Sequence, residues 1–121
     1  MSIDPALLLA QPAFAGLEPH EAEAIAGVMS ARHFEPGQTV IAAGSAPSLL
    51  HIAIGGYAVG PDGQRWPGMF DAAAVLLGQP SQGCVAGEEG LNTLTLARPY
   101  LFTLTREFPS LLRRLPVLAR P

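Results

Sequence analysis

Few side chains of this protein belong to the types that carry out chemistry, and they do not cluster. The 121 residues include three histidines, His20, His33 and His51, and one cysteine, Cys84. None of them stands at a metal-ligand spacing from another, and there is neither a Gly-x-Ser-x-Gly elbow nor a phosphate-binding loop with Gly-Lys. We therefore predict no catalytic residue, no metal ligand and no enzymatic activity.

The histidines and the cysteine are better interpreted as structural. His20 falls on the solvated side of a helix start, and His33 and His51 fall inside strand candidates. Cys84, in a Gly-Cys-Val run, is expected to be a small buried apolar residue rather than a nucleophile. A single cysteine also excludes an intramolecular disulfide and favours a reducing compartment.

The stretch Trp66 to Val85 has the layout of a ligand pocket inserted into a β-rich domain. A tight turn is followed by a short alanine-rich helix, a second turn and a return strand. Where such a pocket should carry charged side chains that hold a ligand, it carries Ala, Ser and Gln. The candidate pocket residues are Met69, Phe70, Asp71, Ala72, Ala73, Ala74, Ser81, Gln82, Gly83 and Cys84.

Composition narrows the classes of partner. Only 14% of residues are charged, all seven basic residues are arginine, and the net charge is -3. This balance argues against a nucleic-acid surface, which needs clustered positive charge. No apolar run approaches the roughly 18 residues of a membrane span, so we expect no membrane insertion and a cytoplasmic location.

The order of elements predicts one domain over residues 1–121, mainly β with flanking helices. Asp4 and Pro5 form a good helix start, and Leu17 to Glu21 opens a second helix that should run to about Ser30. Turn residues then recur every eight to twelve positions, the pattern of a β sandwich or roll. Among them, Gly55-Gly56 is expected to break a strand and Pro61-Asp62-Gly63 to form a hairpin turn. We expect helices over about 5–30, a β roll over about 32–97 and a closing helix over about 98–115, interrupted at Pro109 and ended by Pro116.

Several segments, in this order, are similar to one known family. Phe14–Leu17 looks like an opening Phe-x-x-Leu, Phe34–Ile41 like a Phe-x-x-Gly-x-x-Ile turn and strand, and Leu50–Gly56 like a Leu-Tyr-Ile-Ile-x-x-Gly strand. Pro67, Gly68 and Phe70 resemble the Pro-Gly-Asp-x-Phe entry to a phosphate-binding cassette. The chain thus resembles the cyclic-nucleotide-binding domains of the catabolite activator and protein kinase A regulatory subunit superfamily. That resemblance implies a β roll of the jelly-roll type, with N-terminal helices, a short cassette helix and a C-terminal helix.

The cassette departs from the family at the residues that hold the ligand. The family's Glu, which takes the ribose hydroxyl, falls at Ala73, and its Arg, which pairs with the cyclic phosphate, falls at Ser81. Its Gly falls at Ala72 and its hydroxyl position at Gln82, although Pro80 is kept. Loss of one partner of a buried ion pair costs about 3–5 kcal/mol, a hundredfold or more in affinity. A cyclic nucleotide is thus the cofactor that the family implies, but these residues do not support it.

Asp71 stands at the N-cap position of the short helix. We expect its carboxylate to accept the free N–H groups of that helix and so to occupy the anion site; the alternative is an ordinary N-cap without bearing on ligands.

Two functions therefore stay open. The chain is a regulatory module that has lost binding of cyclic AMP and cyclic GMP and acts on another domain or protein of a signalling system. Alternatively, it is a sensor for a different, less charged small molecule in the same pocket, or binds cyclic nucleotides weakly. Since Pro116 leaves no room for a long dimerisation helix or a recognition helix, direct DNA binding is not expected.

Overall fold

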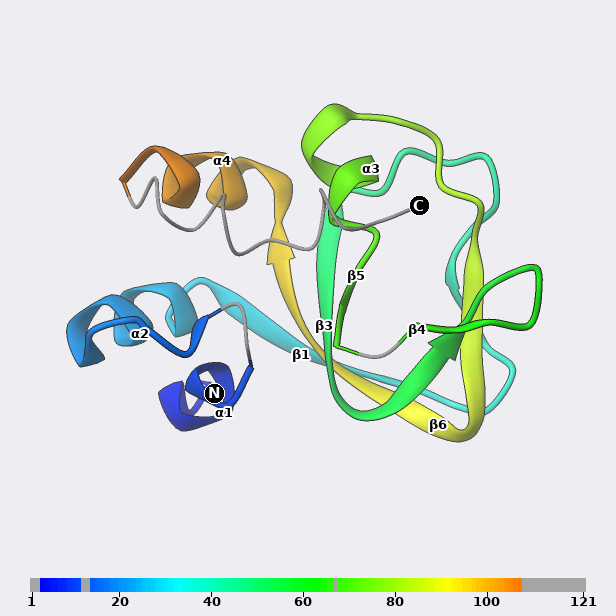
Figure 1. Cartoon of the computed structure of the whole chain (residues 1–121), viewed down its shortest axis with the longest axis horizontal. Helices are drawn as coiled ribbons and strands as arrows, with labels where there is room; N and C mark the ends of the chain where they lie inside the picture. Colours follow the sequence, from blue (N-terminus) through cyan, green and yellow to red (C-terminus); the bar gives the residue numbers. More distant parts are fainter. Residues whose placement is uncertain (1–2, 12–13, 67, 108–121) are drawn as a thin grey trace.

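The computed structural model describes residues 3–11, 14–66 and 68–107, with only the backbone at Ala73. Two helices come first, followed by strands β1 to β5, an inserted helix, the long strand β6 and a closing helix (Figure 1). The elements are α1 (Pro5–Leu9), α2 (Pro19–Ala26), β1 (Met29–Phe34), β2 (Thr39–Ile41), β3 (Leu49–Val59), β4 (Arg65–Trp66), β5 (Met69–Phe70), α3 (Ala72–Leu77), β6 (Cys84–Ala97) and α4 (Arg98–Glu107).

The strands form one antiparallel sheet that curls into a roll, which confirms the predicted fold class. The hydrogen-bonded order is β1-β6-β3-β4, while β2 pairs with β6 and β5 pairs with β3. Figure 1 shows α1, α2 and α4 gathered at one end of the long strands, with the turns of the roll at the other. Among the described residues, no helix is long and apolar enough to cross a membrane.

The starts of the first two helices follow from local chemistry. Asp4 accepts a hydrogen bond from the Ala6 N–H at 2.9 Å, as expected of an N-cap residue before Pro5. The Glu18 N–H donates to Glu21 Oε1 at 2.8 Å and fixes the start of α2.

The second helix is shorter than predicted. It ends at Ala26, before Gly27, and Met29 lies in β1 opposite Leu96 of β6 instead of on a helical face. Glycine is a poor helix former, and pairing with β6 satisfies the backbone groups that further helix would have used. The closing helix begins at Arg98 as predicted and is described to Glu107; its predicted remainder, with Pro109 and Pro116, lies outside the described residues.

Strands β3 and β6 divide the apolar side chains between two cores. Leu50 and Ile52 of β3, with Leu94 and Leu96 of β6, pack under the helices. The other face of the roll packs a second cluster: Phe34, Ile41, Ala53, Ala58, Trp66, Phe70, Cys84, Ala86 and Leu91. Locally this division follows the two-residue alternation of a strand, since Ile52 and its neighbour Ala53 lie in different cores.

The expected break at Gly55 and Gly56 is not observed. Strand β3 continues through them, with register shifts between Ala53 and Gly55 and between Gly56 and Ala58. Ala53 and Ala58 are five positions apart, so a regular strand would send them to opposite faces, yet both lie in the second core. The shifts in register change which face each side chain lies on, so one long strand pairs with β6 along its length and still keeps both alanines in the second core.

His51 lies among the aromatic rings of the second core and is 4% exposed. Its ring stacks on Phe70, with centroids 5.7 Å apart, and meets Phe34 edge-on at 5.8 Å. Its Nδ1 is hydrogen-bonded to Thr93 Oγ1 at 3.2 Å. Burial, with a smaller effect of the nearby Arg32 charge, lowers the pKa of His51 to about 4.

We expect Gly56→Ala to destabilise the fold far more than Gly63→Ala. Both glycines have a positive φ, of 81° and 80°, so each substitution carries a backbone cost of about 1–2 kcal/mol. Only at Gly56 would the new Cβ also collide with backbone, the carbonyl oxygen of Gly90; at Gly63 nothing lies within 4 Å. Urea unfolding should place Gly56→Ala at least about 2 kcal/mol below Gly63→Ala. Equal losses of unfolding free energy in the two variants would contradict the close approach of the Gly56 and Gly90 backbones.

His51 should make the fold less stable in mild acid. As pH falls from 6.5 towards about 4, the unfolded chain binds a proton that the folded ring refuses, so the free energy of unfolding falls. The loss should reach about 3 kcal/mol, 1.36 kcal/mol for each pH unit of the shift. Denaturant titrations at several pH values should show the loss in the wild type and in His20→Gln, whose ring is exposed, and not in His51→Phe. If the free energy of unfolding of His51→Phe fell with pH as steeply as that of the wild type, the effect would belong to another group.

Candidate ligand-binding site

The predicted cassette folds as a turn, the two-residue strand β5, helix α3 and a return into β6. Helix α3 holds the alanine-rich run and ends at Gly78, which has a φ of 64°. Such a left-handed residue is the usual end of a helix. The predicted short helix and return strand are thus observed in that order, whereas strand β5 before the helix was not predicted; Pro67 lies outside the described residues.

The candidate pocket residues divide into three groups. Gln82, Gly83 and Cys84 line a hollow in the surface of the roll. Asp71 and Ser81 bind each other. The remaining described side chains pack against protein: Phe70 lies in the second core, Ala72 in the first, Ala74 is buried, and Met69 packs partly buried on the first core.

Asp71 holds a conformation that is unusual for a residue with a side chain. Its φ of 59° and ψ of 29° place it in the left-handed region, which aspartate tolerates better than most residues. The residue does stand at the N-cap of α3, but its side chain makes no hydrogen bond to the helix backbone. The prediction that its carboxylate takes the free N–H groups of α3 is therefore wrong.

The Asp71 carboxylate instead accepts a hydrogen bond from the Ser81 hydroxyl across the cassette. The Ser81 Oγ in turn accepts from the Gly83 N–H at 3.0 Å. Ser81 is 5% exposed and Asp71 is half-buried, so this network is partly shielded from water. Hydrogen bonds to an ionised group are about twice as strong as neutral ones, which makes this pair the main polar link between the two ends of the cassette.

The backbone of Ser81 is also fixed. Its N–H donates to the Ser45 carbonyl at 2.7 Å, and its carbonyl accepts from the Gly44 N–H at 2.8 Å. The return limb is thereby joined to the turn that follows β2. Ser81, which the sequence resemblance places at the family's arginine position, thus has both its hydroxyl and its backbone bonded to protein.

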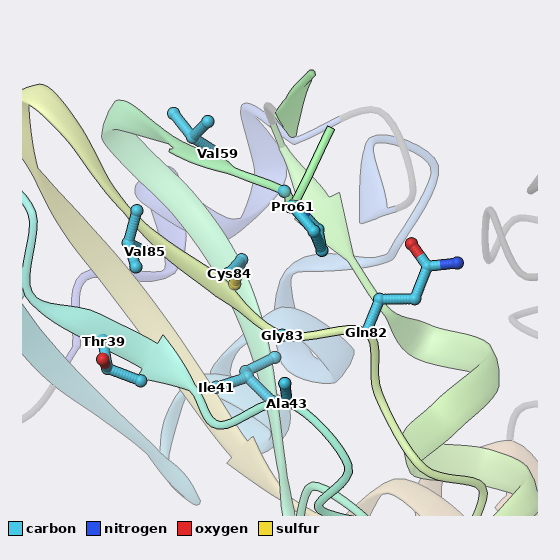
Figure 2. Close-up of a pocket in the computed structure, with 10 residues that line it drawn as sticks. Thr39, Ile41, Ala43, Val59, Pro61, Gln82, Gly83, Cys84 and Val85 are labelled. Carbon is cyan, nitrogen blue, oxygen red and sulfur yellow. The ribbon is translucent and has the colours of Figure 1, made fainter. Parts of the chain in front are cut away.

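The hollow that the cassette borders has a volume of about 320 Å³ (Figure 2). Besides Gln82, Gly83 and Cys84, its walls come from β2 and the turn after it, from the end of β3 and from the start of β6. These further lining residues are Thr39, Ile41, Ala43, Val59, Gly60, Pro61 and Val85.

None of these ten residues carries a formal charge. The Thr39 hydroxyl, the Gln82 amide and the Cys84 sulfur are the side-chain heteroatoms among them, and Cys84 itself is buried. Figure 2 shows the Gln82 side chain extending away from Cys84 and the β2 residues, towards the side of the hollow. Such a surface suits an uncharged, largely apolar group better than a phosphate.

The guanidinium nearest the cassette helix is already engaged. Arg98, at the start of α4, donates from Nε to the Val75 carbonyl of α3 at 2.7 Å. Its guanidinium carbon also lies 4.9 Å from the ring centroid of Phe102. A cation beside the last turn of a helix is favourable, so Arg98 fastens α3 to α4.

Sequence reasoning missed most of the walls of the hollow. Thr39 and Ile41 belong to the Phe-x-x-Gly-x-x-Ile segment, and Pro61 to the predicted hairpin turn, so both segments were visible but had no assigned role. Only the pairing of β2 and β3 with β6 brings them opposite Gln82. Among the described residues there is no group of three or more side chains able to hold a metal ion.

Comparison with known proteins identifies the fold. No family model and no curated protein matches the chain. Among solved structures, the catabolite activator protein of Thermus thermophilus is 23% identical with a TM-score of 0.72, over 90% of this chain and 56% of that one. A cAMP-binding acyltransferase from Mycobacterium smegmatis, in a mutant form, is 24% identical with a TM-score of 0.70, over 96% and 38%.

The regulatory subunit of a cAMP-independent protein kinase A from Trypanosoma brucei is 22% identical with a TM-score of 0.75, over 96% of this chain and 46% of that one. A triple mutant of that subunit, in which one change puts arginine in place of threonine, is bound to cAMP in its A site. It is 21% identical with a TM-score of 0.64, over 84% and 44%. The chain thus has the cyclic-nucleotide-binding domain fold and spans less than two thirds of each of these proteins.

The Asp71–Ser81 hydrogen bond should appear as a coupling energy. In a double-mutant cycle of Asp71→Gly and Ser81→Ala, we expect about 1–2 kcal/mol of coupling in the free energy of unfolding. Glycine is chosen because it removes the acceptor without straining the left-handed backbone.

The matched control pairs Asp71→Gly with Ser30→Ala, an exposed serine of β1. That cycle should give a coupling near zero. A coupling near zero for Ser81 as well would mean that the hydrogen bond contributes nothing to the folded cassette.

Proposed function

We propose that this chain is a regulatory module with the cyclic-nucleotide-binding domain fold that does not bind cyclic AMP or cyclic GMP at micromolar concentration. The Asp71–Ser81 hydrogen bond carries the proposal. In the family pattern, the position of Ser81 supplies the arginine that pairs with the cyclic phosphate. Here the same position donates to a carboxylate of the chain itself.

Charge supports this proposal further. The hollow beside the cassette has no charged lining residue, and the Asp71 carboxylate is held by Ser81, the residue just before Gln82. A cyclic phosphate would therefore meet a negative group instead of a positive one. Arg98 cannot compensate without giving up its bond to Val75 and its contact with Phe102.

The Trypanosoma brucei regulatory subunit offers a parallel. It is named cAMP-independent, and its cAMP-bound form carries a substitution to arginine. A protein of this fold can thus serve in a signalling system without the nucleotide. By analogy, we propose that this chain acts on another domain or protein, and that its role is regulatory and not enzymatic.

The hollow itself favours a second candidate function. A hollow of about 320 Å³ whose lining includes Ile41, Val59 and Pro61 has room for a small uncharged ligand, whose binding would then be the signal. This sensor function is compatible with the loss of cyclic nucleotides. Thermal shift measurements with neutral hydrophobic ligands test it, and Ala43→Trp, which would fill the hollow, is the matched variant.

Isothermal titration calorimetry with cyclic AMP and cyclic GMP tests the main proposal. We expect no binding tighter than about 1 mM, or about -4 kcal/mol. The triple variant Asp71→Gly, Ala73→Glu, Ser81→Arg restores the family residues and should gain at least about a hundredfold in affinity.

The matched control is the double variant Asp71→Gly, Ala73→Glu, which lacks the new arginine and should gain much less. Wild-type binding below about 10 µM would overturn the proposal. Equal affinities of the triple and double variants would mean that the serine at position 81 is not the cause of the lost cyclic-nucleotide binding.

A further inference from the structure

A second hollow lies on the other side of β2. It has a volume of about 230 Å³ and shares only Ile41 with the first one. Its walls come from β1, β2, the turn after β2 and the start of β3. The lining residues are Arg32, Val40, Ile41, Ala42, Ser45, Ala46, Pro47, Ser48, Leu49 and His51. Unlike the first hollow, it contains a formal charge, the Arg32 guanidinium, and no carboxylate.

Arg32 is available to a ligand. It is exposed, and in the described part of the chain its guanidinium makes no ion pair, hydrogen bond or ring contact. Its charge acts on the buried ring of His51, whose protonation it disfavours. Arg32 and His51 line the same hollow, so both side chains can contact one bound group.

His51 provides the inner wall with a ring nitrogen that is not engaged. Nδ1 is bonded to Thr93 Oγ1, whereas Nε2 has no partner among the described residues. No buried side-chain nitrogen or oxygen in that part of the chain lacks a partner, so Nε2 must be accessible to solvent. When the Thr93 hydroxyl donates to Nδ1, the proton of the neutral ring sits on Nε2, which can then donate to a ligand.

The turn after β2 adds hydroxyl groups. The Ser48 hydroxyl has no partner among the described residues, so it is free to donate. The Ser45 hydroxyl already donates to the Ala42 carbonyl at 2.7 Å and can only accept. The available donors of the hollow are thus Arg32, Ser48 and His51.

We propose that this hollow binds a small oxyanion, a carboxylate or a phosphate group, through the Arg32 guanidinium, the Ser48 hydroxyl and the His51 ring. A guanidinium presents two parallel N–H groups that match two oxygens of such an anion, and a hydroxyl and an imidazole complete the set. Because Arg32 is exposed and hydrated, the affinity is millimolar. No residue of this site belongs to the cassette, so the proposal stands apart from the loss of cyclic-nucleotide binding.

An anion beside His51 favours the charged form of the ring, so binding and protonation are linked. Arg32 is the charged group that acts on the His51 ring. The side chains that contact this ring from β1, β5 and β6 are Phe34, Phe70 and Thr93, and none of them is charged. Oxyanion binding therefore raises the pKa of His51 from its value of about 4 and is tighter in mild acid.

The test is to follow the imidazole signals of the full chain by NMR during separate titrations with sodium phosphate and sodium acetate at constant ionic strength. The expected result is a saturable shift of the His51 signal, with little change at His20, which lies on α2 away from the hollow. A phosphate-only response and an acetate-only response each support the site and identify its ligand class.

Arg32→Gln should weaken the response at least about tenfold. It should also raise the pKa of His51 in the absence of ligand, because it removes the opposing charge. The matched control, Arg106→Gln, removes one exposed arginine from α4 and should leave the titration unchanged. A His51 shift that stays linear to about 50 mM of both anions, or that is the same in Arg32→Gln, overturns the proposal.

Discussion

The antiparallel pairing of β3 with β6 is the constraint on which the other parts of this structure depend. These two strands, of 11 and 14 residues, send Leu50, Ile52, Leu94 and Leu96 to the core under the helices and their other faces to the interior of the roll. Every other strand pairs with one of them. The inserted cassette contains β5, which pairs with β3, and ends in β6, so it is fixed at both ends by the same pair of strands. Its internal bonds can therefore form at little further cost in chain entropy.

The same restraint lowers the entropic cost of the hydrogen bond between Asp71 and Ser81. A free anion loses translational and rotational freedom on binding, at a cost of several kcal/mol. Asp71 is already held ten residues before Ser81 in a closed loop, so its hydrogen bond to the serine hydroxyl avoids most of that cost. The left-handed backbone at Asp71 is the opposing term, and aspartate tolerates it better than most residues.

The two hollows that border β2 differ in chemistry because different segments of the chain complete their walls. Ile41 lines both, while residues of the return limb contribute to one side and Arg32 and His51 to the other. One hollow is therefore uncharged and largely apolar, and the other has beside a buried ring a cation that makes no ion pair with the described residues. The low dielectric around His51 disfavours its charged form and strengthens the effect of any charge brought near it. Neighbouring surfaces of one short strand can thus suit different ligand classes.

The sequence by itself determined the features that arise within a few residues. Asp4 before Pro5 marked the first helix, Pro61 to Gly63 the hairpin turn, and the motif order from Phe14 to Phe70 the family of folds, because caps, turns and alternation depend on neighbours in the chain. The tertiary structure decided what pairs at long range. Pairing with β6 ended α2 at Ala26 and drew Met29 into a strand, and it carried β3 through Gly55 and Gly56. It also turned the Asp71 carboxylate towards Ser81 and set β2 opposite Gln82, since these contacts depend on the closure of the roll and not on local preference.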